Sequence, residues 1–367
     1  MPSGLLYQIY MKWFPIPLPP ADSFEGKSAL ITGGTSGLGL AAAAHLVNLG
    51  ATEVIITSRD PSRGAETVLA ELARETSGRS KGVVSLVKLD MNRYDSVVAC
   101  VEEVKKKRMG RGGLDLVILN AGVLGTEHTV VDEGWEQNLQ VNVLSTTLLA
   151  LLLLPWMKSE HASSTSSTSS SSSPPHIVIV GSGQHIGPDI KTWNKNKNKN
   201  GVLAYYNNPT NWPGPRDMYA ATKLMVHYAS REIAELAKGK DGRPEVIVNT
   251  TCPGMVRTGL ARHYTGKSRV FDAFIAAYMG LAAKTPENGA RTLIAAARTK
   301  EGEHGKFIRF YGSEEDYRKQ ANIIFESDEG SGVQSSLWSE ITSELAAKVP
   351  TIRHILSSYT LKQTSTN

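Results

Sequence analysis

The sequence predicts an α/β protein with one doubly wound parallel sheet of about seven strands and helices on both faces. Short apolar runs of strand length alternate with longer helical patterns, which is typical of a parallel sheet covered by helices. A glycine-rich turn joins the first apolar run to the first helical pattern. The chain has 367 residues, enough for a single large domain of this kind.

Seven apolar runs mark the expected strands. They lie at Lys27–Thr32, Glu53–Thr57, Val83–Lys88, Leu114–Leu119, Ile177–Val180, Glu245–Thr250 and Lys306–Phe310. The helical patterns between them cover Leu38–Leu49, Ser96–Lys107, 132–157 and Tyr219–Ala237, and another begins at Asp60-Pro61. Asp is a favoured N-cap residue and Pro is favoured at the first helical position, so Asp60 is expected to cap that helix.

Three parts are expected along the chain. They are an N-terminal arm at 1–24, the sheet domain at 25–312 and a helical tail at 313–367 packed on that domain. The arm is apolar and broken by prolines, so it is expected to pack on the domain, with a weak membrane-surface contact as the alternative. In the tail, the amphipathic stretch Ser335–Ala347 predicts a helix docked on the sheet.

Two segments interrupt the strand–helix pattern. Residues 159–175 are dominated by Ser and Thr, which cannot bury apolar surface, so a flexible loop is predicted there. Residues 183–216 contain many turn formers and predict a long loop that helps to wall a substrate site. This loop is expected to be disordered near 194–200 and ordered near Tyr205–Trp212.

Composition excludes several classes of protein. The formal net charge of +5 is mild for this length and predicts no nucleic-acid partner. The two cysteines, Cys100 and Cys252, make no disulfide framework, which favours a reducing compartment and a cytoplasmic location. The apolar stretch Val143–Met157 is shorter than the roughly 18 residues of a spanning helix, so no transmembrane segment is predicted. It is expected to be buried against a helix or a second subunit, in a monomer or homodimer.

The first predicted strand runs directly into a glycine-rich turn with the pattern T-G-x-x-x-G-x-G. Glycines let the backbone approach a pyrophosphate, and the following helix offers free N–H groups and the positive end of its dipole. Because tight turns need glycine anyway, the strand–turn–helix context supports the prediction of a dinucleotide site. The expected contacts are Gly33, Thr35, Ser36, Gly37, Leu38 and Gly39.

In this context the turn resembles that of the short-chain dehydrogenase/reductase family, in its single-domain branch. Further motifs of that family follow in order over roughly residues 25–312. They are Asn120-Ala121-Gly122 after the fourth strand, Ser182 after the fifth, Tyr219 and Lys223 as Y-x-x-x-K, and Pro253-Gly254 with Val256 and Thr258 as P-G-x-V-x-T. The resemblance implies a Rossmann-like fold and a nicotinamide-dependent oxidoreductase.

The resemblance also implies a role for each matching residue. Tyr219 would transfer the proton, Lys223 would bond the nicotinamide ribose hydroxyls, and Ser182 would hydrogen-bond the substrate oxygen. Asn142 would anchor a water that links Lys223 to solvent, or would make a structural bond between helices. Further cofactor contacts would come from Asp90 at the adenine, Asn120, Ala121, Gly122, Pro253, Gly254, Val256 and Thr258, and no metal is implied.

The end of the second strand sets the expected cofactor preference. An acidic residue there suits the ribose 2′-hydroxyl of NAD, whereas Arg suits the 2′-phosphate of NADP. This chain has Ser58-Arg59 at that point, and Asp60 is assigned to a helix cap. We therefore expect NADP, with NAD as the less favoured cofactor.

The pair Tyr219 and Lys223 has a chemical rationale beyond the motif. Residues four apart share one face of a helix. A free tyrosine has a pKa near ~10, which is too high for efficient proton transfer at neutral pH. A lysine ammonium about 4 Å away, at an effective dielectric constant near 20, would favour the phenolate by about 4 kcal/mol. The sequence thus predicts that Lys223 lowers the pKa of Tyr219.

One departure from the family pattern concerns the substrate. Ser182 and Tyr219 are farther apart than is usual, because of the segment 183–216, and Tyr205, Tyr206 and Trp212 would line a larger apolar pocket or simply pack under the loop. The pattern around Asn211–Lys223 and the tail with its Leu-Trp pair are similar to retinol-dehydrogenase-like members and to fungal secondary-metabolism reductases. The expected substrate is a hydrophobic ketone, aldehyde or alcohol. The alternatives are a non-catalytic dinucleotide-binding regulator and an epimerase or dehydratase of the two-domain branch.

Overall fold

Seven strands form one parallel sheet in the order β3-β2-β1-β4-β5-β6-β7. The computed structural model describes residues 5–167, 173–197, 200–259, 279–310 and 314–364. The strands are β1 Ser28–Ile31, β2 Glu53–Ser58, β3 Val84–Lys88, β4 Leu116–Leu119, β5 His176–Val180, β6 Ile247–Thr251 and β7 Phe307–Ile308. The predicted sheet is confirmed. The strand order reverses between β1 and β4, and parallel sheets bind ligands beyond the carboxyl ends of the strands at such a point.

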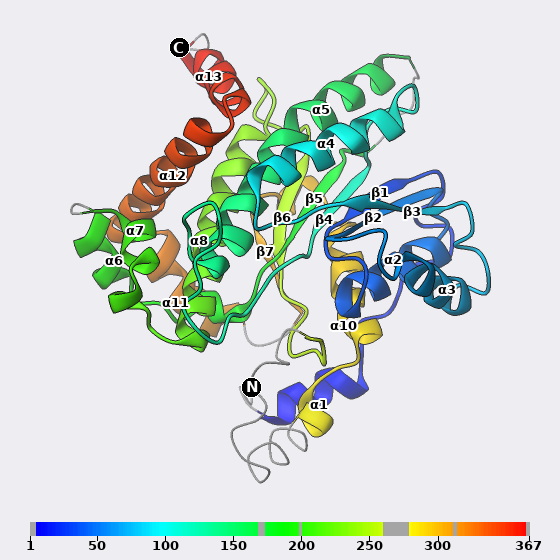
Figure 1. Cartoon of the computed structure of the whole chain (residues 1–367), viewed down its shortest axis with the longest axis horizontal. Helices are drawn as coiled ribbons and strands as arrows, with labels where there is room; N and C mark the ends of the chain where they lie inside the picture. The colour runs from blue at the N-terminus through cyan, green and yellow to red at the C-terminus, as the bar shows by residue number, and fades with distance from the viewer. Residues whose placement is uncertain (1–4, 168–172, 198–199, 260–278, 311–313, 365–367) are drawn as a thin grey trace.

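Helices cover both faces of the sheet (Figure 1). One face carries α4 Tyr94–Arg108, α5 Thr146–Ser167 and α8 Pro215–Leu236, and the other carries α2 Gly37–Asn48, α3 Ala65–Glu75 and α10 Pro286–Ala296. The strand side chains alternate between two hydrophobic cores: Leu30 belongs to the core under α4, α5 and α8, and Ile31 to the core under α2 and α10. The strands are apolar throughout because both faces are buried.

The helix after β4 differs from its prediction at both ends. It begins as a π-helical segment, η1 Leu139–Ser145, and continues as α5 into the serine-rich stretch. The first part of the expected flexible loop, 159–167, is therefore helical, and 168–172 lie outside the described residues. Leu139–Ser163 is long and apolar enough to cross a membrane, but 89% of its most apolar window is buried inside the protein. That burial is typical of a core helix.

Asp60 does not cap α3, contrary to the sequence prediction. The helix starts at Ala65 with Gly64 at the N-cap position. The carboxylate of Asp60 instead accepts a hydrogen bond from the backbone N–H of Ser62 at 3.1 Å and closes a local turn. Asp side chains favour such turns as strongly as helix caps, so the sequence pattern alone did not separate the two.

The connection after β5 is mostly helical. It contains η2 Gly183–Ile186, α6 Ile190–Lys197, α7 Val202–Asn207 and η3 Pro209–Asn211. The prediction of disorder near 194–200 is wrong for the residues of α6, and 198–199 lie outside the described residues.

The described residues of the tail, 314–364, form the helices α11 Glu314–Phe325, α12 Asp328–Lys348 and α13 Thr351–Thr364. The predicted tail helix exists as α12, but it packs on α6, α7 and α8 rather than on the sheet. The carboxylate of Glu340 on α12 accepts hydrogen bonds from the backbone N–H groups of Val202 and Leu203, at 3.0 and 2.8 Å, and so caps α7. The tail thus holds the inserted segment in place.

In the N-terminal arm, the described residues from Leu5 onward begin with the helix α1 Leu5–Trp13. Met11 is buried, and the Lys12 ammonium donates to the backbone carbonyl of Gly280, so the arm is tied to the domain. Tyr10, Trp13 and Phe14 are exposed, and a weak membrane-surface contact stays a prediction.

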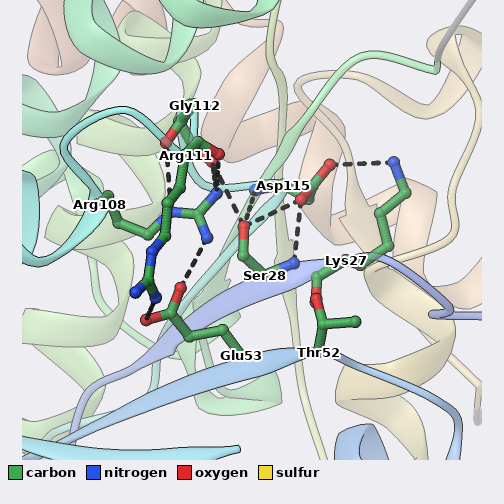
Figure 2. A network of polar contacts seen from close by, with 9 residues as sticks. Lys27, Ser28, Thr52, Glu53, Arg108, Arg111, Gly112 and Asp115 are labelled. Carbon is green, nitrogen blue, oxygen red and sulfur yellow. Dashed lines mark hydrogen bonds and ion pairs between the residues drawn. The ribbon is translucent and has the colours of Figure 1, made fainter.

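A polar network closes the amino ends of β1, β2 and β4, at the edge of the sheet opposite the carboxyl ends (Figure 2). The guanidinium of Arg108, at the end of α4, contacts the Glu53 carboxylate at 2.6 Å. It also donates to the loop carbonyls of Gly112, Arg111 and Gly113 at 3.2, 2.8 and 2.8 Å. The network fixes the α4–β4 loop and so sets where β4 enters the sheet.

Candidate active site

A cavity of about 640 Å³ opens at the carboxyl ends of the strands. It brings together residues that are far apart in the sequence, from the glycine turn to the segment after β6. Of the predicted site residues, it is lined by Gly33, Thr35, Ser36, Gly37, Leu38, Ser58, Arg59, Asp90, Asn120, Ala121, Gly122, Ser182, Tyr219, Lys223, Pro253, Gly254, Val256 and Thr258. Gly39 and Asn142 do not line the cavity and lie behind its walls.

The glycine turn has the shape that a pyrophosphate requires. Gly33 and Gly37 have φ of 63° and 53°, in the left-handed region that favours glycine. A Cβ added to Gly39 would lie 2.3 Å from the carbonyl oxygen of Gly33, so the backbone of the helix packs directly against the backbone of the turn and leaves no space for a side chain. The Ser36 side chain makes no cap bond at the start of α2, which leaves the first N–H groups of the helix for an anion. These features fit a dinucleotide.

Asn120 supports the turn from behind. Its side-chain amide donates to the carbonyl oxygens of Thr32 and Gly33 at 2.9 and 3.2 Å. In return, the Thr32 hydroxyl accepts the backbone N–H groups of Asn120 and Ala121, both at 2.9 Å. The amide N–H groups of Asn120 are therefore used to hold β1 against β4, although the residue also borders the cavity.

Two strand ends meet the cavity at the position expected for the adenosine half of a dinucleotide. Arg59, after β2, is exposed at the cavity wall, and among the described residues no carboxylate pairs with it. The neighbouring Asp60 is turned into its own loop by Ser62. Asp90, after β3, accepts the backbone and side-chain N–H groups of Asn92 at 3.0 and 2.9 Å, which orders this wall.

Ser182, Tyr219 and Lys223 meet at the inner end of the cavity. Tyr219 and Lys223 are buried in the first turns of α8, and the ammonium of Lys223 lies 5.5 Å from the centre of the Tyr219 ring. Lys223 donates to the backbone carbonyl of Val180 at 2.7 Å, which pins α8 to the end of β5. Ser182 borders the same end of the cavity and lies close enough to Tyr219 to affect the pKa of its hydroxyl.

The electrostatics of this pair differ from the sequence prediction. Burial raises the pKa of Tyr219 above its usual value, a nearby thiol at Cys252 raises it further, and the nearby Ser182 side chain partly offsets the rise. Burial also lowers the pKa of Lys223 to about 8. The expectation that Lys223 lowers the pKa of Tyr219 is not met, because desolvation disfavours both the phenolate and the ammonium.

Asn142 lies in the π-helical segment η1, a kind of distortion that is frequent at functional sites. Its amide exchanges two hydrogen bonds with the backbone of Val123, both at 2.9 Å, and donates to the Thr222 hydroxyl at 3.1 Å. Thr222 in turn bonds the carbonyl oxygen of Tyr219 at 2.9 Å. The structural bond between helices is therefore present, and the role of Asn142 in anchoring a water stays a prediction.

Cys252 is a site residue that the sequence analysis did not select. It follows β6 and borders the cavity, and its sulfur accepts the backbone N–H groups of Gly183 and Gly254, each at 3.3 Å. The thiol thereby joins the Ser182 loop to the Pro253-Gly254 turn. The feature of the sequence that could have identified Cys252 is its position directly before Pro253-Gly254 at the end of a predicted strand.

The aromatic residues of the inserted segment do not line the cavity. Tyr206 is buried, and its hydroxyl accepts the indole N–H of Trp193 at 2.8 Å. Tyr205 and Trp212 are partly buried against the same core. Of the two roles considered for these residues, the structure supports packing under the loop.

Comparison with known proteins gives a consistent result. A family model described as short chain dehydrogenase matches residues 27–187. The short-chain dehydrogenase/reductase ffsI of Aspergillus flavipes is 32% identical over 348 residues, which cover 94% of this chain and 94% of that protein.

Two solved structures share the fold. An NADH-dependent reductase A1-R' responsible for alginate metabolism aligns with a TM-score of 0.53 and 20% identity, over 79% of this chain and 97% of its own. A short chain dehydrogenase from Burkholderia cenocepacia J2315 in complex with NADP aligns with a TM-score of 0.54 and 19% identity, over 79% of this chain and 98% of its own. At these identities the likeness concerns the fold alone.

Proposed function

We infer the reaction of this chain from the family to which it belongs, the short-chain dehydrogenase/reductase family of oxidoreductases. We propose that it is an NADP-dependent enzyme that interconverts a ketone or aldehyde and an alcohol on a hydrophobic small molecule. The observation that carries the proposal is that Ser182, Tyr219 and Lys223 come together at one end of a cavity that begins at the glycine turn.

Each residue of the site has its own role in the reduction. A reduced nicotinamide, when bound in the cavity, would supply the hydride for the carbonyl carbon. The hydroxyl of Ser182 donates a hydrogen bond to the substrate oxygen and orients it beside Tyr219. The hydroxyl of Tyr219 gives its proton to that oxygen as the carbonyl becomes an alkoxide, and the product is the alcohol. Lys223 places its charge near the developing phenolate and holds α8 to β5 through Val180.

The raised pKa of Tyr219 suits this direction. A buried tyrosine with a raised pKa is protonated at neutral pH, and the protonated form is the one that reduction consumes. The presence of both Tyr219 and Lys223 in contact with the cavity speaks against a non-catalytic regulator. A hydrophobic substrate, a place in secondary metabolism and a cytoplasmic location stay predictions from the sequence.

The preference for NADP is supported by Arg59. Its guanidinium stands at the end of β2 on the cavity wall, and Asp60, the acidic residue beside it, is engaged by Ser62. A guanidinium can bond a 2′-phosphate through two parallel N–H groups.

The mechanism is tested with a panel of 2-octanone, acetophenone, benzaldehyde and 9,10-phenanthrenequinone, each with NADPH and NADH. We expect Tyr219→Phe to lower kcat by at least about 100-fold, the usual worth of a positioned acid. Tyr228→Phe is the matched control, because Tyr228 is a buried tyrosine on the same helix whose hydroxyl bonds the Ile324 carbonyl at 2.8 Å, away from the cavity. Equal turnover by wild type and Tyr219→Phe would refute the mechanism.

The cofactor preference is tested with Arg59→Asp. Loss of a charge-assisted bond costs about 1.5–3 kcal/mol, so we expect the Kd of NADPH to rise roughly ten- to hundredfold while that of NADH changes little. Arg63→Asp is the control, since Arg63 is also exposed but does not line the cavity. Equal losses for the two cofactors would remove the role of Arg59.

A further inference from the structure

His185 lies directly beneath Ser182 and is almost completely buried. It belongs to η2, three residues after Ser182, and its Nδ1 is 2.7 Å from the carbonyl oxygen of Ser182. Its Nε2 is 3.2 Å from the hydroxyl oxygen of Tyr317 on the tail helix α11. A carbonyl oxygen only accepts, so Nδ1 carries the hydrogen and Nε2 accepts the Tyr317 hydroxyl. One ring therefore bonds the serine loop on one side and the tail on the other.

The ring of His185 is also clamped against the helix that carries Tyr219. It stacks on His227 with 4.8 Å between ring centres and 22° between planes. Tyr219, Lys223 and His227 follow one another at intervals of four residues, so they share one face of α8. Phe307 of β7 closes the other side, edge to face at 4.6 Å. His185 thus sits between the Ser182 loop, the helix of Tyr219 and the tail.

We propose that His185 is a positioning residue, which fixes Ser182 against Tyr219 and makes that fit depend on Tyr317 of the tail. The inference rests on the proposed function, because it takes Ser182 and Tyr219 as the reacting pair. The proposal gives the tail a role in a site that the tail helices do not line. Helix α11 does not border the cavity, but its Tyr317 contacts the His185 ring, and that ring contacts Ser182.

The arrangement has a consequence for the rate of reduction rather than for substrate binding. His185 does not line the cavity, so its loss leaves the walls that hold the substrate in place, whereas the position of Ser182 depends on the His185 ring. Loosening Ser182 should therefore lower kcat and leave KM nearly unchanged.

The test compares three variants on the panel compound that wild type reduces fastest with NADPH. His185→Leu removes both bonds, His185→Asn keeps a donor at the position of Nδ1, and Tyr317→Phe removes only the bond to the tail. For His185→Leu we expect kcat to fall roughly tenfold or more while KM changes less than about twofold, because the serine loop is misplaced but the cavity is intact. We expect His185→Asn to restore most of the rate, and Tyr317→Phe to show a smaller change in the same direction.

The control is His176→Leu. His176 is a buried histidine at the other end of β5, whose Nε2 contacts the carbonyl oxygen of Thr299 at 2.9 Å. A general loss of stability would affect both leucine variants, whereas only His185→Leu should lower kcat at unchanged KM. An unchanged kcat in folded His185→Leu, or an equal fall in kcat in His176→Leu, would overturn the inference.

A second measurement needs no substrate. Nitrogen-15 spectra of histidine-labelled protein identify which ring nitrogen carries the hydrogen, and we expect His185 to be the neutral Nδ1–H form with an Nε2 resonance that moves in Tyr317→Phe. The opposite tautomer would overturn the inference whatever the activity. If Tyr219→Phe is as active as wild type, the proposed function itself fails, whereas an inactive Tyr219→Phe together with an unchanged His185→Leu refutes only the role of His185.

Discussion

Replacing Gly39 by alanine puts one methyl group into the contact between α2 and the glycine turn. The added Cβ would lie 2.3 Å from the Gly33 carbonyl oxygen and 2.7 Å from the Asn120 side-chain nitrogen. Ordinary contacts of this kind need about 3.5 Å, so the turn must retreat by about 1 Å. Overpacking costs about 1–3 kcal/mol, and alanine recovers up to about 1 kcal/mol as a better helix former. After that recovery, the net loss of stability is about 0–2 kcal/mol.

The larger effect should fall on the cofactor. The N–H groups at the start of α2 would bind phosphate at about 2.9 Å, and a retreat of about 1 Å takes them out of hydrogen-bond range. Losing two charge-assisted bonds at about 1.5 kcal/mol each weakens binding by roughly 100-fold. The assay is a fluorescence titration with NADPH, together with thermal unfolding of the same samples.

Gly64→Ala supplies the matched control. Gly64 has φ of 81° and no atom within 4 Å of an added Cβ, so alanine there is strained but not crowded. The left-handed conformation costs about 1–2 kcal/mol, a loss of stability similar to that of Gly39→Ala, with no change in the turn. Wild-type NADPH affinity in Gly39→Ala, or an equal loss of affinity in Gly64→Ala, would refute the assignment of the turn.

Two further predictions concern stability. Arg108→Met should lower the free energy of unfolding by roughly 3 kcal/mol in a urea titration, because Glu53 and the loop carbonyls lose the group that donates to them (Figure 2). NADPH binding should stay unchanged, because Arg108 lies far from the cavity. The exposed pair of Arg243 and Glu301 gives the control, since Arg243→Met should cost less than about 1 kcal/mol. Burial lowers the pKa of His185 to about 4. Between pH 6.5 and about 4, His185 therefore binds a proton in the unfolded chain but not in the folded chain. The free energy of unfolding falls as the pH falls through that window. His185→Asn should reduce this acid-induced loss by up to about 3 kcal/mol, and a profile as steep as that of wild type would contradict the assignment.

Features encoded by local sequence could be predicted. Each strand is a short apolar run bounded by turn residues, and each cofactor motif follows the strand that positions it, so the order of motifs along the chain was sufficient to place Gly33, Asn120 and Tyr219 in one cavity. The serine-rich stretch shows the limit of composition. Ser159–Ser167 stay helical because they continue a helix that is already formed, and Ser159 and Ser163 bond carbonyls of the preceding turn at 2.9 Å.

Features that depend on distant partners could not be predicted. Tyr206 turns away from the cavity because Trp193 donates to its hydroxyl, and α7 is capped by Glu340, which lies more than 130 residues further along the chain. Asn142 lies in the π-helical segment, and its side-chain oxygen accepts the backbone N–H of Val123. No local pattern in the sequence indicates these contacts between residues that are far apart along the chain.

The state of Tyr219 shows why electrostatics were the hardest part to predict from the sequence. A spacing of four residues places Lys223 near Tyr219, and Coulomb attraction alone predicts a lowered pKa for the tyrosine. The structure adds burial of both groups and gives the lysine ammonium a backbone acceptor at Val180, and desolvation then outweighs the attraction. The protein by itself therefore holds a protonated tyrosine beside Ser182. The nearby Ser182 side chain works against the burial of the phenolate, so in the proposed mechanism the position of Ser182 affects how readily Tyr219 gives up its proton.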